Sequence, residues 1–474
     1  MDQYPSTAGL SPVHEEIAGV RTRRKIYRLA IVFAIAFFIR LLLMVVATTY
    51  RFDSEWDFGF EYARIAKWIL LGEGFSSPYY VAPRPSAVMA PAYVYFMALI
   101  FSMFGLYSVP SAIVIYIIQS LFGALTCLVF YHLGTKMFDE KVGLLAAIAL
   151  ALYPPAIFFS VMRVEPVVFI VFLLAWIIYY FLKISETDNY TLPVVCGLLV
   201  GITALVEPTV LSFFVLSYGW LWVYSRTPRR STAKRLGIMG LVTVLSLLPW
   251  TIRNYAVFGT FVPIKSAFGL NLLEGNNPYS DGVMQYTKGF FSVEEREKIH
   301  RRPETPEELK RKEMLSEAER EQKRRLNEVE ADKLMFRKAM EFITAEPEKF
   351  LLFTMRRIFA FWSPVNLYRT TSYDGLRALV YGVPLILGLA GIFMARSRWR
   401  ETSLLVLLFL SYPLSYYVTH ISMYRYRYPV EPFLVLLACY VVVEAAKKIK
   451  GKALASKDQR QGLGLPSTSY PTGS

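Results

Sequence analysis

Long apolar stretches recur along almost the whole chain, and they constrain its fold more than any other feature. The first, Ile26 to Thr48, has about 23 residues and follows a cluster of arginines and a lysine. A helix of that length can cross the hydrocarbon core of a bilayer, and it is too long for the core of a cleaved signal. Hydrophobic residues make up 54% of the 474 residues, a larger fraction than is usual in a chain of several soluble domains. We therefore predict an all-α polytopic membrane protein.

The basic residues stand mainly in short clusters between the apolar stretches. The formal net charge of +15 therefore indicates membrane topology rather than binding to nucleic acid. The three cysteines lie inside apolar runs, without a CxxC pair or a nearby histidine at ligand spacing, at Cys127, Cys196 and Cys439. This pattern supports neither a disulfide framework nor a zinc site.

The charge of the connecting loops predicts how many stretches cross the membrane. Further apolar segments lie at about 91–107, 110–132, 142–159, 164–183, 191–206, 208–224, 236–251, 376–395, 402–419 and 429–446. The basic loops at 226–235, 396–400 and 447–450 should be cytoplasmic. If every segment crossed, the loop at 226–235 would lie outside, so one segment does not cross. The segment 91–107 is short, starts at Pro91 and contains Gly105, and we expect it to be an interfacial helix. About ten transmembrane helices remain.

This topology divides the chain into five parts. They are a cytoplasmic N-terminal tail (1–25), an N-terminal transmembrane module (26–251) with an external loop (49–109), a second external loop with charged amphipathic helices (252–374), C-terminal transmembrane helices (375–447) and a disordered cytoplasmic tail (448–474). Both termini are expected on the cytoplasmic side of the plasma (inner) membrane. The charged part of the second loop is either a solvated linker with helical stretches or a segment that gates access to a substrate.

The first external loop begins with a cluster of carboxylates. Asp53, Glu55, Asp57 and Glu61 fall within nine positions of the stretch RFDSEWDFGFEYARIAKWILLGEGFSSP. A carboxylate at the edge of the bilayer, partly desolvated by aromatic neighbours, is a stronger base than one in water. The alternative is ordinary loop acidity at the start of a helix.

A second group of charges is VMRVEP, with Arg163 and Glu165 at the outer end of a predicted span. Charges at that depth are costly unless they are paired or face water, and these two could simply neutralise each other. Arg40, within the first span, and Glu207, at the bend between two apolar segments, carry the same ambiguity between function and helix packing.

External basic residues form the third group. Arg253 and Lys265 lie in PWTIRNYAVFGTFVPIKSAFGLNLLEGNNP, where a span leaves the membrane, and Arg425 and Arg427 lie in MYRYRYPVEP. Arginine offers a bidentate fork and lysine a mobile point charge, and both suit a lipid phosphate. The alternative is snorkelling to ordinary phospholipid headgroups.

Taken together, these stretches resemble a known family of enzymes. FGFEYARIAKWILLGEGFSSP, MAPAYVYFMALIFSMFGLYS, the ALYPP and RVEP pair, PWTIRNYAVFGTFVP with GNNP, and YRYPVEP are similar to the bacterial protein O-mannosyltransferase and aminoarabinose-transferase superfamily, whose members are membrane glycosyltransferases of the GT-C fold. The resemblance runs from about residue 28 to residue 444. It implies a GT-C fold of about ten transmembrane helices with interfacial helices in two large external loops, and places catalysis in the N-terminal module. It does not specify the sugar.

The resemblance also implies a reaction and roles for residues. A sugar would pass from a polyprenyl-phosphate-linked donor to a protein, lipid or glycan acceptor on the external face, with inversion at the anomeric carbon. Glu61 matches the family's base, with Asp57 as the alternative because the usual adjacent Asp-Glu pair is absent, and Glu165 matches the second acidic position. The cations that would hold the donor phosphate are Arg163, Arg253, Lys265, Arg425 and Arg427. No metal-ligand cluster is evident, and a divalent ion held by carboxylates is left open.

A membrane transporter or lipid flippase is the main alternative, because charged residues and bends within the membrane are also typical of transporters. Transporters of that kind usually contain an internal repeat. None is visible here, and the two halves of the chain are unequal. An enzyme would lose its function when Glu61 is neutralised.

Overall fold

The computed structural model describes residues 12–52, 55, 57–80, 82–278, 280, 282, 322, 326–364, 374–419 and 424–462. Within these ranges every regular element is a helix, and the one pairing of extended backbone is an isolated bridge between Ser76 and Pro85. The predicted all-α class is confirmed.

The helices follow one another through the chain in a simple order. They are α1 (Pro12–Val46), α2 (Phe60–Leu70), α3 (Pro91–Phe104), α4 (Val109–Met137), α5 (Glu140–Leu152), α6 (Pro154–Val161), α7 (Val167–Ile184), α8 (Thr191–Val206), η1 (Pro208–Val210), α9 (Leu211–Tyr224), α10 (Arg229–Phe258), α11 (Phe268–Gly275), α15 (Glu328–Ala345), α16 (Pro347–Trp362), α17 (Asp374–Met394), η2 (Ala395–Arg398), α18 (Trp399–Ser411), α19 (Leu414–Val418), η3 (Tyr424–Tyr426), η4 (Tyr428–Val430) and α20 (Glu431–Gly462).

Each apolar segment predicted to cross the membrane is helical. Six stretches of the described chain are long and apolar enough to span a bilayer by themselves, and α5 with α6 makes a seventh if this pair, bent by 51°, is one span. Three shorter apolar helices lie at Pro91–Phe104, Thr191–Val206 and Pro208–Tyr224. The structure therefore confirms a multi-pass membrane protein, while the number of ten spans stays a prediction.

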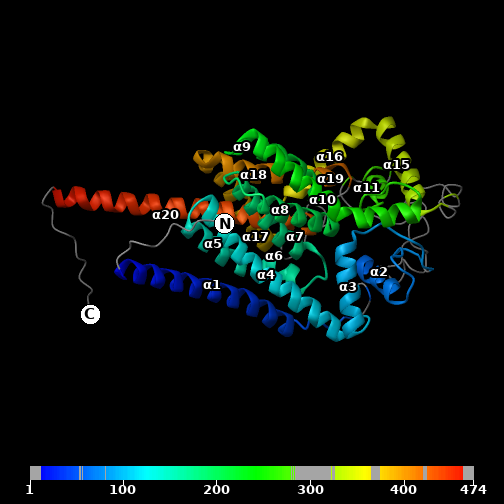
Figure 1. The fold of residues 1–474 in the computed structure, drawn as a ribbon, viewed down its shortest axis with the longest axis horizontal. Helices are drawn as coiled ribbons and strands as arrows, with labels where there is room; N and C mark the ends of the chain where they lie inside the picture. Colours follow the sequence, from blue (N-terminus) through cyan, green and yellow to red (C-terminus); the bar gives the residue numbers. More distant parts are fainter. Residues whose placement is uncertain are drawn as a thin grey trace.

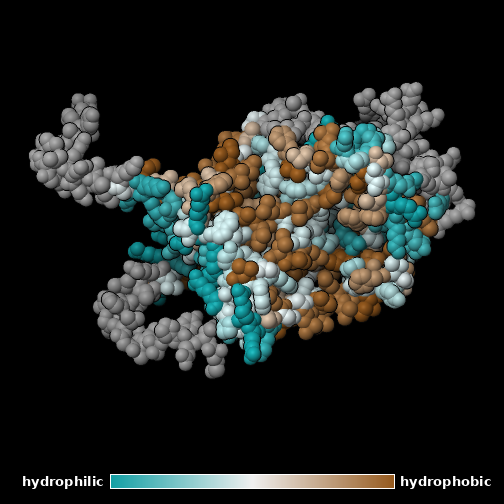
Figure 2. Space-filling model, turned by 90° about the horizontal axis from the view of Figure 1, so that it is seen from above, coloured by the Kyte–Doolittle hydropathy of each residue, from teal (hydrophilic) through white to brown (hydrophobic). Residues whose placement is uncertain are grey.

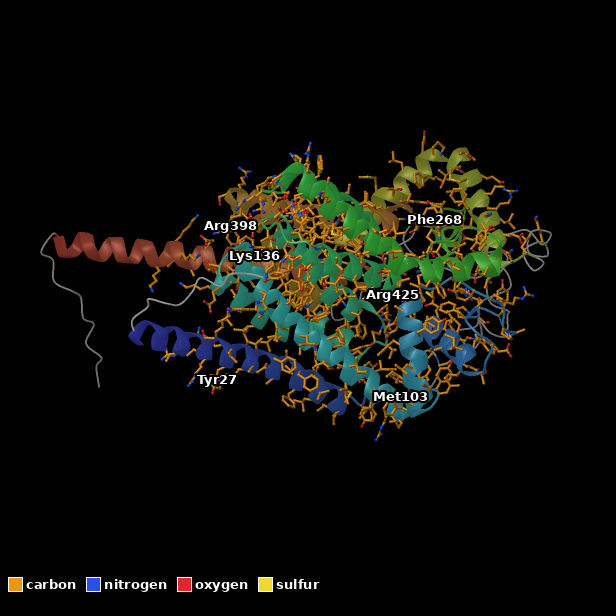
Figure 3. All side chains as sticks on the ribbon, viewed as in Figure 1. Tyr27, Met103, Lys136, Phe268, Arg398 and Arg425 are labelled. Atoms are coloured by element: carbon orange, nitrogen blue, oxygen red, sulfur yellow. The ribbon has the colours of Figure 1, made fainter. Side chains whose placement is uncertain are left out.

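The surface carries the apolar belt expected of such a protein. In the view of Figure 2, apolar residues gather over the middle of the molecule and hydrophilic ones lie toward both ends. Figure 1 shows α2, α3, α11 and α15 together at one end, whereas α1 begins and α20 ends toward the opposite end. Lys136 and Arg398 lie toward that opposite end, and Arg425 and Phe268 lie toward the end with α11 (Figure 3).

The segment predicted to lie along the interface forms α3, which packs against α2 and runs across the direction of α4 (Figure 1). Its start is fixed by Pro91 in the first turn, and its end by Gly105 with a positive φ of 98°. The crossing arrangement fits an interfacial helix, whose depth in a bilayer remains a prediction.

Local signals in the sequence explain several other helix ends. Ser108 caps α4 by accepting a hydrogen bond from the Ser111 N–H, and Asp139 caps α5 in the same way through Val142. Asn327 and Glu330 form a reciprocal capping box at the start of α15. These caps satisfy backbone donors that a helix start leaves without partners.

Two large clusters of buried apolar side chains hold the molecule together. One fills the bundle made by α4, α5, α7, α18 and α20, and the other packs α2, α3 and the loop at 75–90 against the outer part of α4. Val164 belongs to the second cluster and Val167 to the first. The RVEP stretch therefore lies where the two clusters meet, and charged residues from both sides gather there.

Candidate functional site

The start of α2 docks directly onto the RVEP loop. Gly59, just before α2, has a φ of +71°, and a Cβ at this position would lie 2.3 Å from the carbonyl oxygen of Val164. Only glycine therefore fits here, both for its backbone conformation and for its space. This contact brings Glu61, in the first turn of α2, to the same place as Arg163 and Glu165.

Glu61 accepts a hydrogen bond at Oε1 from the hydroxyl of Tyr79, at 3.3 Å. It also interacts electrostatically with Arg425, which comes from the short helix η3 at the far end of the chain. The first predicted carboxylate is therefore held between a phenol donor and a cation.

Glu165 is the most enclosed acid of this group, with 7% of its surface exposed. Its Oε1 lies 3.4 Å from an Nη of Arg425 and 4.0 Å from Nε of Arg163. Its other oxygen, Oε2, is buried without a hydrogen-bond partner. A buried carboxylate oxygen left unpaired is costly, and such atoms are typical of sites that bind or convert a ligand.

Arg425 lies between the two carboxylates. It donates a hydrogen bond to the hydroxyl of Tyr426 at 3.0 Å, and its guanidinium stands 4.9 Å from the centre of that ring. Burial alone would lower the pKa of Arg425, but Tyr426, Glu165 and Glu61 together raise it well above its usual range. The site therefore keeps a permanent positive charge.

Glu207, for which the sequence left both function and helix packing open, lies close enough to act electrostatically on Tyr62. It caps η1 by accepting a hydrogen bond from Thr209 N–H at 3.3 Å. Burial, then Glu207, raises the pKa of Tyr62 well above its usual value, and Glu61 and Glu165 act in the same sense. Tyr62 therefore stays protonated as a neutral hydroxyl among three carboxylates.

Arg163 and Lys265 are the more accessible of the predicted cations. About half of the Arg163 side chain is exposed, at 49%, beside Glu165. Lys265 is half-buried and has no ion pair among the residues that the structure describes. Asp57 is exposed and interacts electrostatically with Tyr116, which Arg163 also faces. Asp57 thus lies at the edge of the same cluster.

Arg253 and Arg427, two of the predicted phosphate-binding cations, make hydrogen bonds to backbone carbonyls, and their role toward a phosphate stays a prediction. Arg253 donates to the carbonyl oxygens of Ser86 at 2.6 Å and Phe75 at 3.0 Å. Arg427 is fully buried, pairs with Glu431 at 3.0 Å and donates to the carbonyls at the end of α16, including Ser363 at 2.9 Å. Both guanidinium groups bind the protein's own backbone, which gives each a role in holding the fold around the site.

The described residues contain no group of three histidine, cysteine, aspartate or glutamate side chains placed to hold a metal ion. Glu61 and Glu165 interact with Arg425, and Glu61, Glu165 and Glu207 all act on Tyr62. Asp53, from the predicted acidic cluster, lies outside the described residues.

Three contributors to the site had no usable signal in the sequence. Tyr79, Tyr62 and Tyr426 stand among 31 tyrosines, and only the fold shows that these three surround the carboxylates. A tyrosine directly after an acidic residue, as Tyr62 follows Glu61, is the nearest thing to a pattern.

Comparisons with known proteins agree with this architecture. Residues 86–252, about a third of the chain, match the family model described as dolichyl-phosphate-mannose-protein mannosyltransferase. A sequence comparison with curated proteins finds no match.

Among solved structures, the chain is similar to the oligosaccharyltransferase AglB from Archaeoglobus fulgidus. The apo form has a TM-score of 0.55 at 14% identity, over 93% of this chain and 53% of that one. AglB in complex with an inhibitory peptide and a dolichol-phosphate has a TM-score of 0.52 at 15% identity, over 94% and 53%. ArnT from Cupriavidus metallidurans bound to undecaprenyl phosphate has a TM-score of 0.46 at 13% identity, over 92% and 64%.

The chain spans about half the length of AglB. The predicted resemblance to the GT-C membrane glycosyltransferases is confirmed, and so is the fold. The donor, the acceptor and the roles of individual residues are matters for proposal.

Proposed function

We propose that this protein is an inverting glycosyltransferase that moves a sugar from a polyprenyl-phosphate-linked donor to an acceptor hydroxyl at the external face of the plasma (inner) membrane. The observation that supports this most is the meeting of Glu61, Glu165 and Arg425, which come from three distant parts of the chain, with one carboxylate oxygen of Glu165 left unpaired. A matching family model over residues 86–252 and the AglB-like fold support the same class.

In this proposal Glu61 is the base. An acceptor hydroxyl is a poor nucleophile until its proton is taken, and a positioned carboxylate contributes about a hundred- to ten-thousand-fold to such a step. The proton passes to Glu61, the acceptor oxygen bonds to the anomeric carbon from one side, and the bond from that carbon to the phosphate oxygen breaks on the other. Asp57, exposed at the edge of the cluster, is the alternative base.

Cations around the cluster stabilise the phosphate that leaves. Fixed positive charge stabilises a developing anion without the reorganisation that water needs. Arg163 is half-exposed and Arg425 is permanently charged, and both lie beside Glu165, so these two are the best placed. Lys265 is half-buried, has no ion pair in the described chain, and remains a further candidate. Arg253 and Arg427 donate to backbone carbonyls, and we assign them to holding the backbone around the site.

Glu165 has a different role from Glu61. Its Oε1 is paired with Arg425 and its Oε2 is free and buried, so it is placed to accept a hydrogen bond from a substrate hydroxyl. We assign it to orienting the acceptor or the sugar. A protein, a lipid or a glycan could supply the acceptor hydroxyl.

The test begins with the lipid-linked sugar that accumulates when the gene is deleted. That lipid, isolated and radiolabelled, is incubated with purified protein, and transfer is followed as loss of label from the lipid fraction. Wild-type protein should catalyse transfer and Glu61→Gln should not, at equal folded protein. Movement of the intact lipid across vesicle membranes, undiminished in Glu61→Gln, would instead identify a flippase.

A further inference from the structure

The first external loop contains a closed hairpin between residues 75 and 86, just before α3. Ser77 N–H donates to the Arg84 carbonyl at 2.7 Å, and Ser86 N–H donates to the Phe75 carbonyl at 2.9 Å. These bonds flank the isolated bridge between Ser76 and Pro85. The two ends of the hairpin are therefore fixed to each other.

Two charged side chains hold the base of this hairpin from different elements. Arg253, from α10, donates to the carbonyls of Phe75 and Ser86, one on each arm. Glu328, at the start of α15, accepts hydrogen bonds from the Ser86 hydroxyl at 2.6 Å and the Ala87 N–H at 2.7 Å. Two elements from distant parts of the chain therefore hold the base of the hairpin.

Tyr79 lies beyond this base, on the part of the hairpin that faces α2. Its N–H donates to the Ser77 hydroxyl at 3.4 Å, and its own hydroxyl donates to Glu61 Oε1 at 3.3 Å. Burial and the nearby Glu61 raise the pKa of Tyr79 well above its usual value, so the phenol remains a donor. A phenol that stays protonated can donate a hydrogen bond to the Glu61 carboxylate.

We infer that Tyr79, held by the 75–86 hairpin, is a positioning residue that orients the Glu61 carboxylate. This inference rests on the proposed function only where Glu61 acts as the base. The groups that face Glu61 are Tyr79 from the hairpin, Tyr62 from α2 itself and Arg425 from η3. A hydrogen bond donated to a carboxylate stabilises its charged form and fixes the direction of its second oxygen.

Tyr79→Phe removes the hydroxyl and keeps the ring that packs in the loop. Tyr80→Phe is the matched control, because Tyr80 is the next residue on the same hairpin and its ring contacts Arg84 rather than Glu61. Both variants should be recovered at wild-type levels with unchanged thermal stability, since only an oxygen is lost from each.

The first measurement needs no sugar donor. Dicyclohexylcarbodiimide reacts with protonated carboxyl groups, and the modified residue is identified by mass spectrometry. Tyr79→Phe should increase the labelling rate of Glu61 severalfold, because the hydrogen bond that holds its Oε1 is lost and the carboxyl group can turn toward the reagent. Tyr80→Phe should leave the rate unchanged. Equal labelling in wild-type and Tyr79→Phe protein would overturn the inference.

The second measurement uses the labelled lipid-linked sugar described above. Tyr79→Phe should lower kcat about tenfold with the KM for the donor unchanged, because the base is no longer held in its reactive orientation. Adding Tyr79→Phe to Glu61→Gln should cause no further loss, because the residue acts through Glu61. An additional tenfold loss of kcat in the double variant would show that Tyr79 does not act through Glu61.

The two measurements separate this inference from the proposed function. If carbodiimide labelling changes as expected but wild-type protein transfers no sugar, Tyr79 still positions Glu61 and the enzyme assignment fails. If wild-type protein transfers sugar but neither measurement moves in Tyr79→Phe, the assignment stands and the positioning role fails.

Discussion

Arg40, buried in the helical bundle, and Arg425, part-buried beside Glu165, show how differently this protein uses the same side chain. Arg40, in α1, has 1% of its surface exposed and no ion pair with a carboxylate among the residues described. Its guanidinium donates to the carbonyls of Ala36 at 2.7 Å and Ala151 at 3.3 Å, and to the hydroxyl of Ser160 at 3.2 Å. Arg425 instead faces Glu61 and Glu165.

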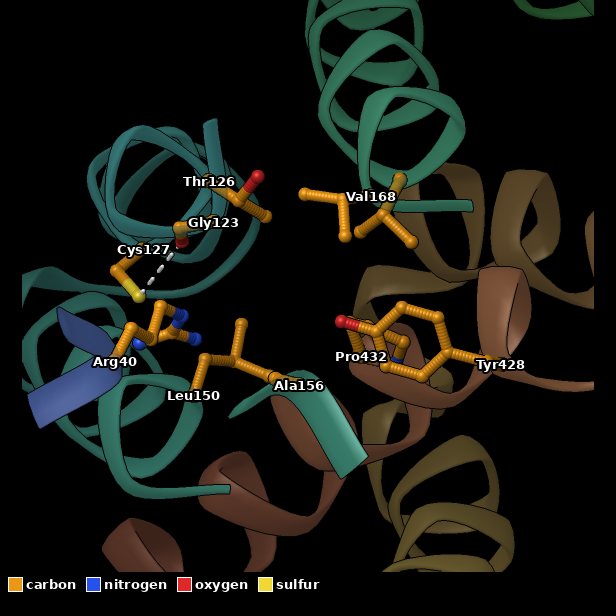
Figure 4. Close-up of a pocket in the computed structure, with 10 residues that line it drawn as sticks. Arg40, Gly123, Thr126, Cys127, Leu150, Ala156, Val168, Tyr428 and Pro432 are labelled. Atoms are coloured by element: carbon orange, nitrogen blue, oxygen red, sulfur yellow. Dashed lines mark hydrogen bonds between the residues drawn. The ribbon is translucent and has the colours of Figure 1, made fainter. Parts of the chain in front are cut away.

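The surroundings of Arg40 explain why a charge is tolerated in the bundle. Ala151 is in the last turn of α5, where the break before α6 leaves carbonyls without helical partners, and lipid offers no water to satisfy them. Gly123 makes room, since a Cβ there would lie 2.9 Å from Arg40 Nε. Figure 4 shows Arg40 beside Gly123 and Cys127 at a small cavity, with Tyr428 on its other side.

The difference lies in which acceptors remain free. Around Arg40 the donors meet backbone carbonyls and the hydroxyl of Ser160, which itself donates to the Ala156 carbonyl. Around Arg425 the ion pair leaves Glu165 Oε2 buried without a partner. Arg40 thus stabilises a broken helix, whereas Arg425 belongs to the group that we propose to bind the substrate.

The largest effect on kcat is expected at Glu61, in the group around Arg425. Glu61→Gln should reduce kcat about a thousandfold, because the proton acceptor is lost while the shape of the side chain stays. Thermal stability should remain close to that of wild-type protein, and Asp57→Asn should reduce kcat much less. A near-normal kcat in Glu61→Gln with a large loss in Asp57→Asn would move the base to Asp57.

The opposite pattern is expected in the bundle. Arg40→Met should lower the free energy of unfolding by about 2 kcal/mol, since the carbonyl of Ala151 and the hydroxyl of Ser160 lose their donor. The protein that remains folded should keep most of its kcat. Detergent-solubilised variants compared by thermal unfolding and by transfer at equal folded protein measure both. A stable Arg40→Met protein that has lost kcat would place Arg40 in the functional group instead.

A smaller effect is expected at Arg163, the half-exposed cation beside Glu165. Arg163→Ala should raise the donor KM about tenfold, because a charge-assisted contact to the phosphate is lost. Arg396→Ala is the control, since Arg396 lies in η2, away from the cluster, and contacts the ring of Phe393. An unchanged donor KM in Arg163→Ala would leave Lys265 and Arg425 as the phosphate ligands.

The sequence predicted the helical segments and the three charged groups, but it did not separate cations by role. Arg253 and Arg163 have similar sequence contexts, since both stand at the predicted outer end of an apolar run. They differ because two carbonyls of a distant loop happen to lie within reach of Arg253. Such contacts depend on how the 75–86 hairpin closes and on α15, and neither leaves a pattern near residue 253. Periodicity predicts which face is apolar, but not which carbonyl an arginine meets.

The smallest expected effect concerns Glu328, the charged residue that holds the hairpin from outside the membrane. Burial raises the pKa of Glu328 above its ordinary value, even though the hydrogen bonds from Ser266, Ser86 and Ala87 lower it. Between the ordinary value and the raised one, the folded protein binds a proton that the unfolded chain has released. The contribution of Glu328 to stability is therefore fully present below its ordinary pKa and is lost as pH rises through the folded pKa.

Glu328→Gln keeps an acceptor for Ser86 and Ala87 without the charge, so the Tm of the variant relative to wild-type protein should increase with pH across the range just above the ordinary value. Glu341→Gln, exposed on the same helix and paired with Lys338, leaves the contacts of Glu328 intact and should show the wild-type dependence. If the Tm of Glu328→Gln instead falls relative to wild-type protein as pH rises, the contacts with Ser86 and Ala87 stabilise the ionised carboxylate and not its protonated form.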